Sequence, residues 1–273
     1  MVMFRHTLFA FPFALVGAFM AARGLPDLRQ LFWICLAVLG ARNGANGLNR
    51  LVDKEIDAKN PRTKDRHLPV GLVKRKEAIL LVLACFAILV IATYMIKPFF
   101  VLLLPIPMLL FVVYSYTKRF TWLCHLILGA AVAGAPVGAW IAVAGTLELP
   151  ALILGTAVAL WVAGFDVIYG TLDVEFDRKE ALFSIPAVFG IPRALQISTG
   201  MHVLSIAFLC SLYGFLPLGY LYLVGLLAVT SLLVYEHLIV SPTQLGQVKI
   251  AAYNVNEIVA PIFMVFVIAD LLL

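Results

Sequence analysis

Charged residues are scarce in this sequence. Only 13% of its 273 residues are Asp, Glu, Lys or Arg, whereas 63% are hydrophobic and the mean hydropathy is +1.02. Soluble globular chains carry about 25% charged residues, so this composition excludes an ordinary soluble domain and is typical of polytopic helical membrane proteins. No polar stretch is long enough to form a second core. The sequence therefore predicts one membrane-embedded domain over residues 1–273.

The sequence also lacks the cysteine spacing of a disulfide framework or a zinc site. Its 4 cysteines lie in apolar runs without a CxxC pair, which indicates small buried hydrophobic side chains. The net charge of +5 is carried mainly by short loops, where it reports membrane orientation and not nucleic-acid binding. Nothing in the sequence indicates an obligatory protein partner.

What the sequence has in abundance is long apolar runs. A helix needs about 20 apolar residues to cross a bilayer, and nine runs approach that length: residues 6–23, 28–48, 77–96, 98–116, 122–144, 148–170, 191–212, 216–238 and 253–273. We expect an all-α integral membrane protein with nine transmembrane helices. The first run ends like a signal peptide, but the loop charges fit nine helices only if it is retained as a span.

Basic residues gather in alternate loops. One set of loops holds most of them, including residues 50–76, 118–119 and 178–179, whereas the opposite set holds only Arg23, Arg29 and Lys97. Cytoplasmic loops are enriched in Lys and Arg. The protein is therefore predicted to be integral to the cell (inner) membrane, with the N-terminus and the polar motifs described below facing the cytoplasm.

Two groups of polar residues follow apolar runs with a spacing of four. The first is Asn49, Asp53 and Asp57; the second is Asp173 and Asp177, with Asp166 two turns earlier. A spacing of four places side chains on one face of a helix. We refer to residues 49–57 and 166–177 as the first and second acidic motifs, and expect cytoplasmic cap loops at about 49–76 and 171–190.

The acidic motifs predict a metal and polyanion site. A charge at the bilayer centre costs about 2.5–3.5 kcal/mol, so these carboxylates must face water, a metal or one another. Mg²⁺ prefers oxygen ligands and keeps several waters. Two acidic motifs facing one cavity would hold metal ions with a polyanion such as diphosphate between them.

Basic and aromatic residues near the motifs supply further candidates. Arg42 and Asn46 extend the first polar stripe into the membrane, where Arg42 would pair with an acidic residue or bind a substrate carboxylate or hydroxyl. Arg62 and Arg66 follow closely enough to fold back over the motif, and guanidinium groups suit phosphate oxygens. The pair Lys118-Arg119, after Tyr114, is either an interfacial anchor or a second phosphate clamp. Tyr169 could shield a carbocation.

A second class of function also explains intramembrane acidic residues. In an ion-coupled transporter or a cation channel, they would line an ion path. That interpretation gives no reason for the basic residues beside the first motif.

In combination, these motifs resemble the UbiA superfamily of intramembrane prenyltransferases. The resemblance rests on Asn49-xxx-Asp53-xxx-Asp57 with Arg62-Thr-xx-Arg66, and on Asp166-xx-Tyr169-xxx-Asp173-xxx-Asp177 half a chain later. The Tyr114-xxx-Lys118-Arg119 element and the small-residue run 129–139 are similar to the branch that prenylates 4-hydroxybenzoate. The first motif also resembles a group associated with quinone synthesis, including menaquinone made by the futalosine route.

The resemblance implies nine helices around a central cavity in which two Mg²⁺ ions and an isoprenyl diphosphate lie between the motifs. The implied metal residues are Asn49, Asp53, Asp57, Asp173 and Asp177. The implied catalytic residues are Asp53, Asp57, Asp166, Asp173 and Asp177. The implied substrate-binding residues are Arg42, Asn46, Asn49, Arg62, Arg66, Tyr114, Lys118, Tyr169 and Lys179.

The expected reaction is transfer of the isoprenyl group to an aromatic acceptor such as 4-hydroxybenzoate. A dihydroxynaphthoate in menaquinone synthesis is the alternative acceptor. The ring proton would pass to Asp166 or Asp173.

Overall fold

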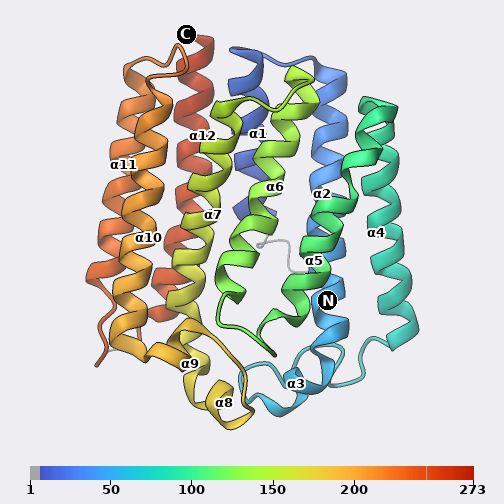
Figure 1. The fold of residues 1–273 in the computed structure, drawn as a ribbon, viewed down its shortest axis with the longest axis vertical. Helices are drawn as coiled ribbons and strands as arrows, with labels where there is room; N and C mark the ends of the chain where they lie inside the picture. Colours follow the sequence, from blue (N-terminus) through green and yellow to red (C-terminus); the bar gives the residue numbers. More distant parts are fainter. Residues whose placement is uncertain (1–6, 244) are drawn as a thin grey trace.

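The computed structural model describes residues 7–243 and 245–273, and the regular elements of these residues are all helices (Figure 1). This confirms the predicted fold class. Arg5 and residue 6, which belong to the predicted first loop and first span, lie outside the described residues.

Each predicted apolar run corresponds to a helical segment. The segments are α1 (Thr7–Ala22), α2 (Leu28–Val52), α4 (Arg75–Ile96), η2 (Pro98–Leu103) with α5 (Pro105–Thr117), α6 (Cys124–Ala144), α7 (Leu149–Gly170), α10 (Ile191–Leu212), α11 (Tyr220–Leu238), and η4 (Ile250–Val255) with α12 (Asn256–Leu272). Of these, η2 is a 3₁₀ helix and η4 is a π-helix.

The segments stand side by side in a closed arrangement. Helix α2 packs on α4 and α5, α5 on α6, α6 on α7, α7 on α10, α10 on α11, α11 on α12, and α12 on α1. Helix α1 also contacts α2 and α6, so the beginning and the end of the chain meet in one bundle. The largest hydrophobic core lies among these helices and includes Trp140, Tyr222 and Phe263, each at most 1% exposed.

Small residues let the helices approach closely. A Cβ atom on Gly17 of α1 would lie 2.4 Å from the Pro136 carbonyl oxygen of α6, and one on Gly129 of α6 would lie 2.1 Å from the Ala159 oxygen of α7. Van der Waals packing at small residues is a main source of helix association in membranes, where lipid is as apolar as the helix surface.

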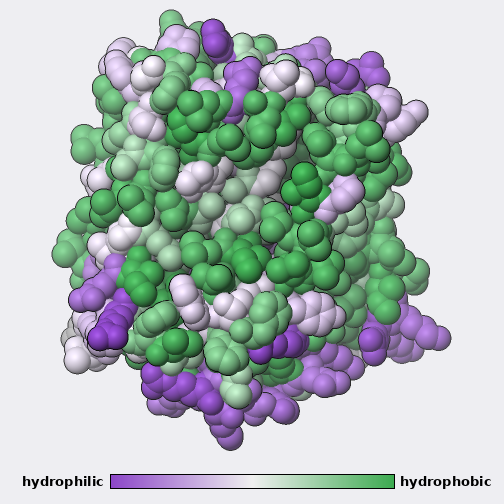
Figure 2. All heavy atoms as spheres, viewed as in Figure 1, coloured by the Kyte–Doolittle hydropathy of each residue, from purple (hydrophilic) through white to green (hydrophobic). Residues whose placement is uncertain are grey.

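The outer surface is suited to a bilayer. Seven described segments are long and apolar enough to cross a membrane. Leu80, Leu102 and Leu227 are 66%, 70% and 67% exposed. Figure 2 shows hydrophobic residues over the sides of the bundle and hydrophilic residues gathered at the end that carries the short helices. The protein is an integral membrane protein.

Three segments differ in their bounds from the predictions. Helix α2 continues through the polar residues to Val52, because those side chains face a cavity and not lipid. Helix α11 begins at Tyr220 and not at 216, since Pro217 and Gly219 precede it and the Asp270 carboxylate accepts hydrogen bonds from the Gly219 and Tyr222 amides at 2.6 and 3.1 Å. The last segment begins at Ile250, three residues early, as a π-helix.

Both acidic motifs fold in the same local way. Helix α2 ends beside Asp53, and a six-residue helix α3 (Lys54–Lys59) follows. In the second motif η3 (Thr171–Asp173) follows α7, and a six-residue helix α8 (Val174–Lys179) comes next. Each motif is thus not one uninterrupted helix: the chain bends at Asp53 in the first and at Asp173 in the second, and the last Asp of each, Asp57 or Asp177, lies on a short helix.

The short helices form a cap at one end of the bundle (Figure 1). Helices α3, α8 and α9 (Ile185–Phe189) lie there. Lys59 of α3 donates a 2.7 Å hydrogen bond to Glu180 beside α8. This hydrogen bond raises the pKa of the Lys59 ammonium, which is fully exposed. The contact links the two cap regions at the surface.

Candidate active site

Both acidic motifs line one cavity of about 220 Å³. Its wall comes from α1, α2, α3, the loop after α3, α5, α6, α7, α8 and η4. The polar lining comprises Arg42, Asn46, Asn49, Arg50, Asp53, Asp57, Asn60, Arg62, Thr63, Arg66, Tyr114, Lys118, His125, Asp166, Tyr169, Asp173, Asp177, Ser184 and Tyr253. The predicted convergence of the two motifs is therefore present in the structure.

Asp53 lies where α2 meets α3 and is 4% exposed. Its carboxylate accepts hydrogen bonds from Asn49 at 3.1 Å and from Arg119 at 2.8 Å, and the Lys118 ammonium lies 3.4 Å away. Two cations after α5 thus neutralise the first acidic residue. Such pairing removes most of the cost of a carboxylate at this depth.

Asp57 is paired with a cation from its own loop. Arg66 Nη1 donates to both of its carboxylate oxygens, at 2.7 and 2.8 Å. The Thr63 hydroxyl donates to the Asp57 backbone oxygen at 3.0 Å, which holds the loop against α3. Arg66 therefore folds back over the first motif, as the sequence predicts.

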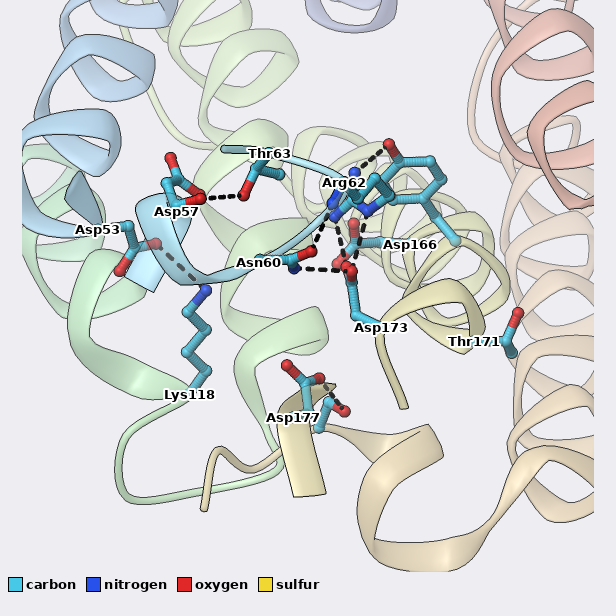
Figure 3. A network of polar contacts seen from close by, with 12 residues as sticks. Asp53, Asp57, Asn60, Arg62, Thr63, Lys118, Asp166, Thr171, Asp173 and Asp177 are labelled. Carbon is cyan, nitrogen blue, oxygen red and sulfur yellow. Dashed lines mark hydrogen bonds and ion pairs between the residues drawn. The ribbon is translucent and has the colours of Figure 1, made fainter. Parts of the chain in front are cut away.

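Asp173 receives the same loop from the other half of the chain (Figure 3). Arg62 donates to both oxygens of its carboxylate, and Asn60 Nδ2 donates to Oδ1 at 3.0 Å. Arg62 also donates to the Tyr169 hydroxyl and lies over that ring, 4.6 Å from its centre. Residues 60–62 thus bridge the first motif to the second.

Burial and pairing act in opposite directions on Arg62. Burial, the largest single effect, favours the neutral guanidine, but the hydrogen bonds and the charge of Asp173 outweigh it and raise the pKa of the Arg62 guanidinium. Arg62 is therefore a permanent positive charge in the cavity.

Among the described residues, Asp177 and Asp166 each have one hydrogen-bond partner. The Ser184 hydroxyl donates to Asp177 Oδ2 at 2.8 Å, and Asp177 is 8% exposed. His125 Nδ1 lies 2.7 Å from Asp166 Oδ2. In Figure 3 Asp166 lies on the same side of the cavity as Asp173, with Asp53 and Asp57 opposite them.

The cavity changes from polar to apolar along its length. Arg42 and Asn46 line it from the middle of α2, and Arg42 is close enough to interact electrostatically with Tyr114, Tyr253 and Asp166. Apolar lining is supplied by Phe9, Leu128, Val132, Val162 and Phe165. The cavity thus offers a charged end for an anionic group and an apolar wall for a hydrocarbon or aromatic group.

One predicted substrate residue lies elsewhere. Lys179, at the end of α8, is exposed and does not belong to the cavity lining. The six-residue helix turns it outward while it keeps Asp177 buried. Every other candidate from the sequence lines the cavity.

The structure adds four cavity residues that the sequence did not single out for the site: Asn60, His125, Ser184 and Tyr253. No spacing rule connects His125 to Asp166. Arg119, which the sequence paired with Lys118, reaches the site through its hydrogen bond to Asp53. Arg50 also lines the cavity, and its Nη1 is buried without a hydrogen-bond partner among the described residues. A guanidinium nitrogen in that state favours an anionic ligand.

The donor set fits Mg²⁺. Both motifs offer carboxylate and amide oxygens, but in the described residues no three His, Cys, Asp or Glu side chains converge on one point. Mg²⁺ is commonly bound by one or two carboxylates, substrate phosphate oxygens and waters, and not by a protein cage. Separate carboxylates facing one cavity therefore suit this ion.

The fold and the cavity define a class of protein: an integral membrane protein whose helices surround a site for a substrate with an anionic group and an apolar part. The comparisons with known proteins identify the family. The family model of the UbiA prenyltransferase family matches residues 10–258. The chain belongs to this family and is a prenyltransferase.

Relatives and solved structures agree with this assignment. The chain is 35% identical over 230 residues to a 4-hydroxybenzoate octaprenyltransferase of Vibrio cholerae, covering 81% of this chain and 78% of the relative. It is similar over 100% of both chains to the apo structure of a UbiA homolog from Aeropyrum pernix K1, with a TM-score of 0.89 and 33% identity. A UbiA homolog from Archaeoglobus fulgidus bound to GPP and Mg²⁺ shares the fold, with a TM-score of 0.70, 20% identity, and 97% and 95% coverage.

Proposed function

We propose that this protein uses Mg²⁺ to transfer an isoprenyl group from an isoprenyl diphosphate to an aromatic acceptor of the 4-hydroxybenzoate type, in quinone biosynthesis. The observation that carries the proposal is the meeting of both acidic motifs, with their basic partners, in one cavity that also has an apolar wall. The 4-hydroxybenzoate octaprenyltransferase relatives support the acceptor class. The Archaeoglobus fulgidus homolog with GPP and Mg²⁺ supports the donor and the metal.

In this proposal the diphosphate lies between the motifs. Asn49, Asp53, Asp57, Asp173 and Asp177 would hold Mg²⁺, which when bound supplies charge neutralisation and Lewis acidity to the leaving group. Arg62, Arg66 and Lys118 lie beside these carboxylates and would turn to the phosphate oxygens. Their attraction grows as negative charge develops on the leaving diphosphate, and this is where binding energy accelerates a reaction.

The rest of the cavity would bind the carbon skeletons. The prenyl chain would follow the apolar lining, where burial contributes about 0.8 kcal/mol per CH₂ group. The rings of Tyr169 and Tyr253 pack edge to face in the cavity wall, 4.6 Å between centres, and their π-electrons would stabilise an allylic cation. Arg42 would bind the acceptor carboxylate. Exclusion of water protects the cation until an electron-rich ring carbon attacks it.

The decisive experiment is a product assay with matched acidic variants. Purified protein in nanodiscs is incubated with Mg²⁺, labelled geranyl diphosphate, and 4-hydroxybenzoate or 1,4-dihydroxy-2-naphthoate, and the products are identified by mass. We expect prenylated 4-hydroxybenzoate. Asp53→Ala and Asp177→Ala should abolish measurable turnover, a loss of at least about 10²-fold, while membrane insertion is retained. EDTA should stop the wild-type reaction.

Each acidic variant has a control on a short helix of the same motif. Glu55 on α3 and Glu175 on α8 are exposed, so Glu55→Ala and Glu175→Ala should remain active. Full activity of Asp53→Ala, or full wild-type activity in EDTA, would contradict the proposal. If only the naphthoate is prenylated, the acceptor is a dihydroxynaphthoate and not 4-hydroxybenzoate, and the rest of the proposed mechanism is unchanged.

A further inference from the structure

We infer that His125 is a positioning residue that holds Asp166 as the acceptor of the ring proton. This inference rests on the proposed function, in which the attacked ring carbon must lose its proton. It begins from a pair of residues on two helices: His125 lies in the first turn of α6, and Asp166 lies one turn before the end of α7.

The imidazole is held closely against α7. Nδ1 lies 2.7 Å from Asp166 Oδ2, and the His125 side chain is 5% exposed. The neighbouring ring atom Cε1, between the two nitrogens, packs against the same helix, because a Cβ atom added to Gly170 would lie 3.1 Å from it. Because Gly170 has no side chain, the His125 ring fits against α7 at this position. The ring therefore has little freedom to leave the carboxylate.

The surroundings assign the tautomer. His125 Nε2 is buried and has no hydrogen-bond partner among the described residues. A proton on Nε2 would bury a positive N–H group without an acceptor, which costs more than a lone pair without a donor. Nδ1 therefore carries the proton and donates it to the carboxylate, as in other carboxylate–histidine pairs. Asp166 is thus held in one orientation by His125.

Asp166 is better placed than Asp173 to accept a proton. Arg62 and Asn60 occupy both oxygens of Asp173. In contrast, only Oδ2 of Asp166 is hydrogen-bonded to the described residues, and its side chain is 26% exposed, in the cavity lining. Asp166 also interacts electrostatically with Arg42 and Tyr114, near the expected position of the acceptor.

The proton step is balanced without a further reactant. After the ring carbon bonds to the prenyl carbon, its C–H bond breaks and the electron pair restores the aromatic ring. The proton forms an O–H bond with Asp166 Oδ1, while Nδ1–H of His125 remains on Oδ2. A positioned general base of this kind contributes about 10²–10⁴-fold to a rate. The proton then leaves to water when the product is released.

The test compares 4-hydroxybenzoate with 4-hydroxybenzoate deuterated at the two ring carbons beside the hydroxyl. In the wild type, ionisation of the diphosphate is expected to be slowest, so deuterium has no effect on kcat. His125→Ala should lower kcat about 10- to 100-fold, leave both KM values close to wild type, and produce a normal primary isotope effect. His125→Asn, whose amide can donate where Nδ1 does, should restore most of kcat and remove the isotope effect.

The controls separate positioning from folding. His125→Phe keeps the ring volume but has no hydrogen-bond donor. If His125→Ala does not fold, His125→Phe replaces it, and it should show the same lower kcat and the same isotope effect. His237 is also hydrogen-bonded, to His202 and Thr199, but lies outside the cavity lining, and His237→Ala should keep wild-type kcat without an isotope effect. Unchanged kcat in the His125 variants, or a loss of kcat without an isotope effect, would overturn the inference. Absence of any prenylated product from the wild type would instead overturn the proposed function.

Discussion

At the scale of single residues, the site is a set of carboxylates neutralised by protein cations. Asp53 lies beside Lys118 and Arg119, Asp57 beside Arg66, and Asp173 beside Arg62. Near the bilayer a carboxylate paired with a cation is less costly to bury than an isolated charge. Binding of a metal and a diphosphate would exchange these partners, because the metal would take the carboxylates and the diphosphate would take the protein cations.

Arg42 gives a prediction at this scale. It lines the cavity from the middle of α2, on the side of Tyr114 and Asp166. Arg42→Ala should raise KM for 4-hydroxybenzoate by about 10- to 100-fold, because a hydrogen bond to a charged group contributes about 1.5–3 kcal/mol. KM for geranyl diphosphate should change much less. Steady-state kinetics with each substrate varied in turn measures both.

The matched control for Arg42 is on the same helix. Arg29, in the first turn of α2, is exposed, so Arg29→Ala should leave both KM values unchanged. If Arg42→Ala weakened geranyl diphosphate more than the acceptor, the acceptor would have to be placed elsewhere in the cavity.

At the scale of elements, irregular helix ends place the functional side chains. The two acidic motifs bend at Asp53 and at Asp173 and continue as six-residue helices, so Asp57 and Asp177 turn back into the cavity. The last segment begins with the π-helix η4, which carries Tyr253 to Tyr169 and Phe9. π-Helical turns are rare and frequently occur at functional sites, because the extra residue redirects a side chain.

Asn256 stabilises η4, and its removal should be costly. It is 0% exposed, accepts a 2.7 Å hydrogen bond from Trp161 Nε1, and donates to the Ala251 oxygen at 3.1 Å. Asn256→Leu leaves the buried Trp161 donor without a partner, which should lower the free energy of unfolding by about 1–3 kcal/mol. Thermal unfolding in detergent should show a lower Tm, and kcat should fall as Tyr253 moves.

The neighbouring exposed Asn254 provides the comparison within η4. Asn254→Leu should keep both Tm and kcat. An Asn256→Leu protein as stable as the wild type would show that the hydrogen bonds of Asn256 do not hold the π-helix.

At the scale of the whole molecule, charge is distributed unevenly between the two ends. The cap end carries the cavity lining and the basic loops, and the sides between the ends are apolar (Figure 2). Basic loops are retained in the cytoplasm. The expected orientation therefore places the cap and the active site in the cytoplasm, where water-soluble aromatic acids would enter.

Single added cysteines test the orientation. Lys64 is exposed in the loop after α3, and Thr146 is exposed between α6 and α7 at the opposite end of the bundle (Figure 1). In spheroplasts of an expressing bacterium, a membrane-impermeant maleimide should label Thr146→Cys at once and Lys64→Cys only after permeabilisation. The unmodified chain, with its own 4 cysteines, gives the background. The reverse labelling pattern would invert the topology.

The helical membrane bundle and most of the residues that line the cavity could be predicted from the amino-acid sequence alone. Long apolar runs require helices in a membrane, since backbone groups there have no water to bind. Polar residues with a spacing of four at the ends of two runs could face only a shared polar cavity, because lipid contact would be too costly. Arg62 and Arg66 were predictable because they lie within ten residues of the first motif in the chain.

The hydrogen-bond and ion-pair partners of the site residues could be learned only from the three-dimensional structure. Arg62 pairs with Asp173, 111 residues away, and His125 with Asp166, 41 residues away. These partners depend on how α6, α7 and the loop after α3 are packed, and helical periodicity carries no information about distant neighbours. Packing also accounts for three other features that the sequence did not predict: the π-helix, the outward orientation of Lys179, and the ion pair of Arg119 with Asp53. The spacing of residues along the chain determines which side chains share one face of a helix, whereas the packing of the helices determines which residues that face contacts.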